Sequence, residues 1–302
     1  MSLRTLHPPG RSWWQRELVR TWAGLAPALL LVGVLFGGAV VLALLHSIGL
    51  VGVGDQTGPS LTPYRALLSD PVVLRSLGLT FYVAVVATGL SVVLGIASAL
   101  LLRRLVRGRR LATMVFQLNL PVPHVIGAVA ILALVGQSGW LSRLGARAGL
   151  LEGPAAFPAI TFDPWAIGVL LQYLWKEVPF IGVVALAILA SSGDELDEAA
   201  RTLGASPWQR LRHVTLPLLL PGVLAAAVIV FAFTFGTFEV PLLLGPSSPT
   251  VLPVLAHRRF TDIDLAARPE AMALSVLITA VVIAVVLLGA AAARRSIRAD
   301  GP

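Results

Sequence analysis

The chain has 302 residues, of which 57% are hydrophobic and 13% are charged, and its net charge is +8. Soluble globular domains usually carry about 25% charged residues, so this composition excludes an ordinary soluble domain and favours a membrane protein. Cysteine is absent, which excludes a disulfide framework, a zinc–thiolate site and an iron–sulfur cluster. The single lysine, Lys176, follows Leu174-Trp175, so no GxxxxGK(S/T) loop is present to bind nucleotide phosphates.

Apolar residues gather in six runs, each long enough to cross a hydrocarbon core of about 30 Å. Backbone polar groups must be satisfied inside a bilayer, so the sequence predicts an all-α polytopic membrane protein. The predicted spans are Leu25–Leu45, Ser76–Leu102, Leu111–Gly136, Trp165–Ala190, Pro217–Leu244 and Ala271–Ala293. We expect one transmembrane domain over residues 25–293, with a cytoplasmic segment, 1–24, before it and a cytoplasmic tail, 294–302, after it.

The segment before the first span is basic, and its stretch Ser12–Arg20 combines Trp13 and Trp14 with arginines. Tryptophan and arginine beside an apolar run are typical of the headgroup region, so we expect a short interfacial helix here. The first apolar run is too long for a signal peptide and lacks a small-x-small cleavage site. We therefore expect this segment to stay attached to the protein.

The arginines are divided unevenly between the two sides of the predicted bundle. Fifteen lie in the N-terminal segment, in residues 103–110, in residues 191–216 and in the tail, whereas seven lie in the segments of the other side. The positive-inside rule places both termini and these two loops in the cytoplasm. Topology thus explains the basic excess, which gives no support to nucleic-acid binding.

Polar residues at membrane depth are costly and usually face a cavity or a partner side chain. The predicted third span begins with a polar stretch that is interrupted by prolines and contains Asn119 and His124. Lys176 and Glu177 lie in the middle of the fourth span, where Pro179 could break the helical hydrogen bonds. We interpret these four polar residues as candidates for a translocation pathway.

The cytoplasmic loop 191–216 carries signals for two short helices. Ser192 followed by Glu195 is typical of a capping box that starts the first helix, and Gly204 can supply the left-handed residue that ends it. Apolar residues recur on one face of this helix at helical spacing. They are Leu196, Ala199, Ala200 and Leu203.

The second helix of the loop begins with a cap residue and a proline in their preferred places. Ser206 precedes Pro207, and Gln209 stands at the third helical position. Together the two parts predict a compact helix–turn–helix hairpin. From the pattern alone, a capped linker exposed to solvent remains an alternative interpretation.

The run Glu198-Ala199-Ala200, with Gly204 four residues later and Leu216-Pro217 at the end, resembles the EAA loop of a known family. That family is the permease subunits of type I binding-protein-dependent ABC importers. Its motif is cytoplasmic and precedes the penultimate membrane helix, and both conditions agree with the orientation inferred from the arginines. The resemblance therefore implies a six-helix permease fold.

The resemblance also implies a role for each residue of the motif. Glu198 is expected to contact a basic residue of the ATPase, while Ala199 and Ala200 allow close approach of the docked helix. Gly204 is expected to form the bend, and Leu216-Pro217 to lead into the fifth span. The loop would thus couple a separate ATPase to the membrane helices.

The partners implied by the resemblance are a dimer of ABC ATPase subunits, a second permease subunit and an extracytoplasmic substrate-binding protein. The second permease would be another copy of this chain or a homologue. No catalytic residue, cofactor or metal site is expected, because the histidines are scattered and no enzyme motif lies in the spans. The expected location is the inner membrane of a bacterium or archaeon.

Glu239 lies inside the predicted fifth span and joins the pathway candidates, although a structural ion pair between Glu239 and Lys176 is an alternative. The surrounding stretch, Gly236 to Gly245, resembles the polyamine, iron(III), thiamine and phosphonate branch of these permeases. Two carboxylates in the pathway favour a small polar or cationic solute such as a polyamine. A secondary transporter or channel is the rival interpretation of the whole chain.

Overall fold

The computed structural model describes residues 11–51, 58–105 and 107–299, and these residues form helices and connections without any strand. The helices are α1 (Arg11–Val32), α2 (Gly38–Ser47), α3 (Thr62–Ser69), α4 (Pro71–Arg104), α5 (Arg109–Gln117), α6 (His124–Val135), α7 (Trp140–Arg147), α8 (Ile167–Ile188), α9 (Asp194–Thr202), α10 (Pro207–Arg210), α11 (Leu216–Gly236), α12 (Glu239–Leu244), α13 (Leu252–Phe260) and α14 (Arg268–Ala299). Three π-helical turns connect consecutive helices, and they are Gly33–Gly37, Leu189–Gly193 and Leu211–Thr215. Short 3-10 turns occupy Pro154–Ala156 and Leu265–Ala267.

Among the described residues, six helical segments are long and apolar enough to cross a membrane, which confirms the predicted all-α polytopic fold. The predicted third span, Leu111–Gly136, is not a single helix, and its interruption coincides with the polar, proline-containing stretch of the sequence. α5 ends at Gln117 and α6 begins only at His124. Pro121 and Pro123 lie in the gap, and neither can donate the backbone hydrogen bond that a continuous helix needs.

The predicted fifth span, Pro217–Leu244, is also interrupted. α11 ends at Gly236, and the separate helix α12 begins at Glu239. A helix continuing through this point would bring the ring of Pro241 against the carbonyl of Thr237, four residues earlier. In α12, Pro241 instead stands in the first turn, where its missing N–H costs nothing.

The centre of the bundle is the pairing of α4 with α8, the most extensive helix contact in the described structure. A Cβ atom added at Gly95 would lie 2.8 Å from the Cβ of Ile181, and one added at Gly182 would lie 2.7 Å from the ring of Phe116. Glycine at these positions allows the helices to approach closely, as is typical of membrane bundles.

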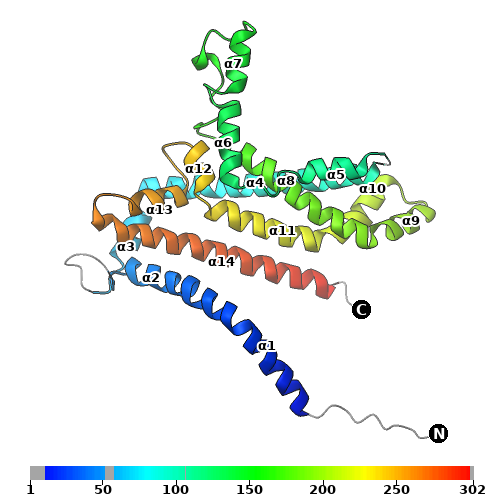
Figure 1. The fold of residues 1–302 in the computed structure, drawn as a ribbon, viewed down its shortest axis with the longest axis horizontal. Helices are drawn as coiled ribbons and strands as arrows, with labels where there is room; N and C mark the ends of the chain where they lie inside the picture. The colour runs from blue at the N-terminus through cyan, green and yellow to red at the C-terminus, as the bar shows by residue number, and fades with distance from the viewer. Residues whose placement is uncertain (1–10, 52–57, 106, 300–302) are drawn as a thin grey trace.

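Figure 1 shows α4, α8, α11 and α14 side by side along the long axis, with α6 and α7 projecting away from this layer. α1 and α2 lie at the edge, where α2 packs on α14 and the apolar part of the first span has no buried residue. The backbone of residues 11–20 is helical and continuous with this span. Its position at a membrane interface remains a prediction, and residues 1–10 and 300–302 of the terminal segments lie outside the described residues.

An ion-pair cluster joins three helices at the end of the molecule that lies opposite α9 and α10 (Figure 1). Arg259 lies at the end of α13. Its Nη2 is 2.5 Å from Asp70 Oδ2, and its Nη1 is 2.7 Å from Glu270 Oε2. Asp70 is also the N-cap of α4, because its side chain accepts a hydrogen bond from the N–H of Val72. This hydrogen bond and the Arg259 guanidinium hold the pKa of Asp70 below its usual value, against the opposing effect of burial.

Candidate functional site

The turn of the hairpin forms as the sequence predicts. Gly204 has φ of +84°, a left-handed conformation that glycine adopts without steric cost. The N–H of Ala205 donates to the carbonyl of Ala200, and the N–H of Gly204 donates to that of Arg201. These bonds close the end of α9 in the pattern of a Schellman motif.

The predicted start of the second hairpin helix is also present. The N–H of Ser206 donates to Gln209 Oε1 at 2.8 Å, and the N–H of Gln209 donates to Ser206 Oγ at 3.3 Å. Pro207 occupies the first helical position. This reciprocal capping box fixes the direction in which α10 leaves the turn.

The junctions between the hairpin and the bundle are helical rather than flexible. The π-helical turn Leu189–Gly193 joins α8 to α9, so Ser192 is not the helix start that the sequence suggested. The backbone there stays helical, and no free N–H groups need a cap. The π-helical turn Leu211–Thr215 joins α10 to α11, which begins at Leu216 and Pro217. The hairpin therefore continues α8 and α11 through helical backbone on both sides.

The face of α9 that carries the motif is open to solvent. Glu198 and Ala199 are exposed, and Ala200 is half-buried. Leu196 is 47% exposed and Leu203 is 88% exposed. An apolar surface of this kind beside a carboxylate is typical of a protein contact, because leaving it in water is unfavourable.

An ion pair that the sequence analysis missed connects the two arms of the hairpin. Arg210 Nη1 on α10 donates to Asp197 Oδ2 on α9 at 2.6 Å. Both side chains are partly buried, at 20% and 27% exposure. The pair holds α9 and α10 together, so the hairpin can move as one body.

Lys176 is buried in α8, and its ammonium group is directed at the break between α5 and α6. Nζ donates to the carbonyls of Asn119, Leu120 and Val122 at 2.7, 2.6 and 2.5 Å. The amide of Asn119 in turn donates to the carbonyl of Trp175. Lys176 thus stabilises the interrupted backbone, and it does not form the ion pair with Glu239 that was one interpretation.

His124 and Glu177 meet beside this break. His124 Nε2 lies 3.2 Å from Glu177 Oε1, and the His124 ring packs on Phe233 of α11 with 4.4 Å between the ring centroids. Gln172, which the sequence analysis missed, donates to the carbonyl of His124 at 3.2 Å. The structure therefore brings Asn119, His124, Lys176 and Glu177 into one polar cluster where α6, α8 and α11 meet.

Glu239 stands apart from this cluster. It begins α12 and is exposed, and no hydrogen bond or ion pair connects it to another residue in the part of the chain that the structure describes. Its carboxylate lies at the positive end of a short helix, where a negative charge is favoured.

Residues 91–299 match the family described as the binding-protein-dependent transport system inner membrane component. The chain belongs to this family. It is a permease subunit of a binding-protein-dependent ABC importer, and the matched range contains both the hairpin and the polar cluster. A permease of this kind is a transport component of a membrane rather than a catalytic one.

Similar proteins include the molybdenum transport system permease protein ModB of Mycobacterium tuberculosis, which is 34% identical over 235 residues and aligned over 76% of this chain and 83% of that protein. The probable sulfate transport system permease protein cysT of Marchantia polymorpha is 28% identical, over 67% of this chain and 69% of that protein. Neither name mentions a polyamine, iron or thiamine.

The fold of the permease is similar to those of solved ABC transporters. A bacterial alginate ABC transporter, solved in complex with an alginate pentasaccharide-bound periplasmic protein, contains a chain with a TM-score of 0.77 at 19% identity, and the match covers 95% of this chain and 98% of that one. The MetNI methionine transporter gives a TM-score of 0.55 at 19% identity, with 78% and 98% coverage. At this level of identity, the likeness concerns the fold.

Proposed function

We propose that the permease transmits movement from a separate ATPase dimer to the membrane through the hairpin formed by α9 and α10. One observation carries this proposal: the hairpin is continuous with α8 and α11, while its outer face is apolar and exposed. Burying a leucine contributes about 1.5–3 kcal/mol, so docking Leu196 and Leu203 in a groove would supply much of the contact energy.

In this proposal, each motif residue has a physical role in docking or in transmission. Glu198 faces a basic residue of the ATPase, and the small side chains of Ala199 and Ala200 let the docked surface approach closely. Gly204 sets the bend, and Leu216-Pro217 carries the movement into α11. Because the junctions are helical, displacement of the hairpin displaces α8 and α11 as well.

We also propose that two permease subunits assemble with an extracytoplasmic substrate-binding protein, and that both termini lie in the cytoplasm of a bacterium or archaeon. The beginning of α1, the end of α14 and the hairpin lie at the same end of the molecule (Figure 1), which supports this orientation. α7 projects with Trp140 62% exposed and Leu144 50% exposed, which supports a contact with a second permease.

The test uses the complex of this permease with its ATPase and binding protein, reconstituted in liposomes. Glu198→Lys should reduce ATP-driven uptake by about tenfold, the effect of losing about 1.4 kcal/mol of docking energy. Glu152→Lys makes the same charge change on an exposed residue between α7 and α8 and should leave uptake unchanged. Normal uptake by Glu198→Lys would contradict the coupling role, whereas uptake by the permease alone without ATPase would favour a secondary transporter.

For the solute, two observations support two different classes. The exposed carboxylate of Glu239 supports a small cationic or zwitterionic solute such as a polyamine, through Coulomb attraction. The molybdenum and sulfate systems among the relatives support an oxyanion. The polar cluster of His124, Lys176, Glu177 and Asn119 would line the pathway in either case.

Titration of the cognate binding protein distinguishes the two classes. Tryptophan fluorescence should respond to putrescine if the solute is a polyamine, and to molybdate or sulfate if it is an oxyanion. In uptake assays, Glu239→Gln should weaken transport of a cation but leave transport of an oxyanion unchanged. If none of the three ligands changes the fluorescence of the binding protein, neither solute class is supported.

A further inference from the structure

The backbone hydrogen bonds of α8 are interrupted at Pro179. In a continuous helix, the carbonyl of Trp175 would accept from the N–H of residue 179, and proline has no N–H. This carbonyl accepts instead from the side-chain amide of Asn119, which lies in the break between α5 and α6. A side chain of a neighbouring segment thus supplies the donor that α8 lacks, as backbone groups at membrane depth require.

The break between α5 and α6 lies opposite this gap in α8. Before the break, the ring of Phe116 in α5 packs against Gly182, which follows Pro179 in α8. After the break, His124 of α6 contacts Glu177, which precedes Pro179. The hydrogen-bond ladders of two neighbouring membrane helices are therefore interrupted at the same level.

The two halves of α8 belong to different apolar cores. Val169 and Tyr173 pack in a cluster with residues of α4, α6 and α12. Ile181 and Ala185 pack in a second cluster with residues of α4 and α11. Pro179 lies between the two clusters in sequence, so α8 can bend there while each half keeps its own core.

An apolar groove of about 520 Å³ borders the same point of α8. Val178 and Pro179 line it from α8, and Leu94 of α4 and Val115 of α5 line it from the other helices. Asn119 belongs to its lining as well. Because side chains do not fill this space, α8 has room to change its angle at Pro179.

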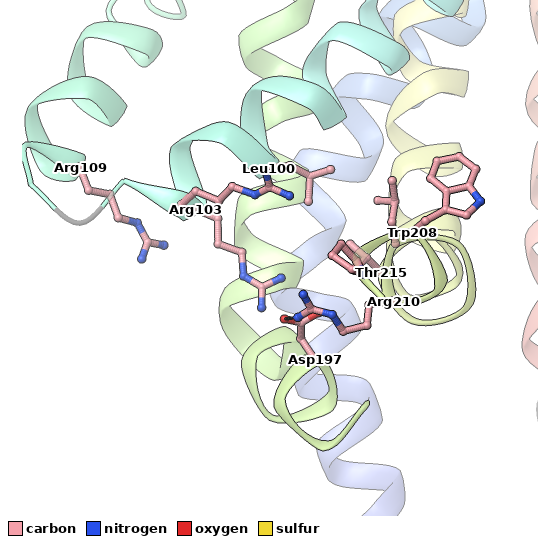
Figure 2. Close-up of a pocket in the computed structure, with 10 residues that line it drawn as sticks. Leu100, Arg103, Arg109, Asp197, Trp208, Arg210 and Thr215 are labelled. Carbon is pink, nitrogen blue, oxygen red and sulfur yellow. Dashed lines mark hydrogen bonds and ion pairs between the residues drawn. The ribbon is translucent and has the colours of Figure 1, made fainter. Parts of the chain in front are cut away.

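The hairpin is joined to the half of α8 that follows Pro179. Asp197 and Arg210 face each other between the arms of the hairpin (Figure 2), with 2.6 Å between the paired atoms. This pair holds α9 to α10, and the π-helical turn Leu189–Gly193 joins α9 to α8. A displacement of the hairpin therefore reaches Pro179 through continuous helical backbone.

We propose that α8 bends at Pro179 when the hairpin moves, and that Asn119 is the positioning residue that connects this bend to the break between α5 and α6. The proposal rests on the coupling function of the hairpin and deepens it, because it names the point where the movement reaches the polar cluster. A side-chain donor can follow the carbonyl of Trp175 as the helix bends, whereas a backbone N–H would hold the helix straight. Lys176 and Glu177 contact the break and the start of α6, so these segments move with the bend.

A double-mutant cycle on the purified permease tests the hydrogen bond of Asn119. Asn119→Leu removes the donor and should lower the melting temperature in detergent by about 3 °C. Pro179→Ala restores a backbone N–H to α8, so Asn119→Leu in that background should lower the melting temperature by less than about 1 °C. Equal effects of Asn119→Leu in the two backgrounds would overturn the role given to Asn119.

ATP-driven uptake by the complete complex in liposomes tests the bend. Pro179→Ala should reduce uptake roughly fivefold, which corresponds to about 1 kcal/mol, because the restored hydrogen bond must open before α8 bends. Its melting temperature should not fall, since the substitution adds a hydrogen bond. The matched control, Pro27→Ala, removes a proline from inside the exposed part of α1 and should leave uptake unchanged. Normal uptake by Pro179→Ala, or a lower melting temperature, would overturn the bend.

The outcomes also separate this proposal from the coupling function. Pro179→Ala should retain the ATPase on co-purification, because the docking surface is unchanged, whereas Glu198→Lys should lose it. Normal uptake by Glu198→Lys would contradict coupling, and the cycle on Asn119 and Pro179 would still report on the permease alone. Reduced uptake by Glu198→Lys with normal uptake by Pro179→Ala would overturn the bend and leave coupling in place.

Discussion

Lys176 illustrates how a charge buried in a membrane bundle can support the backbone instead of meeting a counter-ion. Its ammonium group donates to three carbonyls in the break between α5 and α6, and each bond uses one of its three protons. These carbonyls lie outside the helices, where prolines interrupt the backbone, although the carbonyl of Asn119 also accepts a hydrogen bond from the N–H of Val122. The lysine therefore replaces the hydrogen bonds that a continuous helix would have made.

Lys176→Met should lower the stability of the permease by about 1–3 kcal/mol, since three part-buried carbonyls lose their charged donor. The melting temperature of the detergent-purified protein, followed by size-exclusion fluorescence, measures the change. Glu239→Gln alters an exposed carboxylate and serves as the control, with no expected shift. An unchanged melting temperature for Lys176→Met would contradict the supporting role.

Asp70 should make stability sensitive to acid. Its pKa is lowered in the folded protein from an ordinary value of 3.8, first by the Val72 N–H and also by Arg259. A carboxylate with a lowered pKa stabilises the fold above the ordinary value, and this contribution is lost as the pH falls through the lowered pKa. We expect the melting temperature of the unmodified protein to fall more steeply below about pH 4 than that of Asp70→Asn. Parallel pH curves for the two proteins would contradict this expectation.

At the residue scale, sequence reasoning predicted local features and missed distant ones. Gly204 and the Ser206 cap follow from rules that act within four residues, and the structure has both. The partners of Lys176 lie 54–57 residues away in sequence. No local pattern specifies such a contact, and the same applies to the Asp197–Arg210 pair across the hairpin turn.

At the element scale, the hydropathy of the sequence predicts where the chain enters the membrane better than where its helices end. Apolar residues lie on both sides of each break, so hydropathy alone places one span across each of them. Pro121, Pro123 and Pro241 were the available signals, and their effect on the backbone is stronger than the apolar preference. The fourth span also contains a proline, Pro179, yet α8 continues through it. A proline alone therefore does not decide whether a helix breaks.

Glycines on α4 allow a comparison within one helix. Gly95→Val should destabilise the permease by about 1–3 kcal/mol, because the added carbons would meet Ile181. Gly89→Val is the matched control, since nothing lies within 4 Å of a Cβ atom at that position. The midpoint of thermal unfolding in detergent measures both variants. Equal melting temperatures would show that α4 and α8 can separate without cost.

At the scale of the whole molecule, the structure gathers the proposed cytoplasmic features at one end. The hairpin and the end of α14 lie there, whereas α3, α13 and the beginning of α14 lie at the other end (Figure 1), where Arg259 contacts Asp70 and Glu270. The arginine count thus predicted that the hairpin and the C-terminal tail lie on one side, and in the structure the hairpin and the end of α14 lie at the same end. The positive-inside rule assigns the end with the hairpin to the cytoplasm.

The absence of native cysteine makes this orientation directly testable. Ala155→Cys and Arg107→Cys each introduce one exposed thiol, on opposite sides of the proposed membrane. A maleimide that cannot cross membranes should label Ala155→Cys in intact cells, and should label Arg107→Cys only after permeabilisation. The reverse labelling pattern would show that the topology is inverted. Labelling of both variants in intact cells would contradict the six-span arrangement.

The π-helical junctions on both sides of the hairpin also constrain the length of this segment during evolution. Along a helix, each added residue rotates everything beyond it by about 100°. One residue inserted in α8 would therefore turn Glu198 away from its docking partner. One residue inserted in α11 would rotate the hairpin relative to the part of α11 that packs in the bundle. Insertions and deletions among relatives should accordingly be concentrated between α2 and α3 and between α7 and α8, with the distance from α8 to α11 held constant.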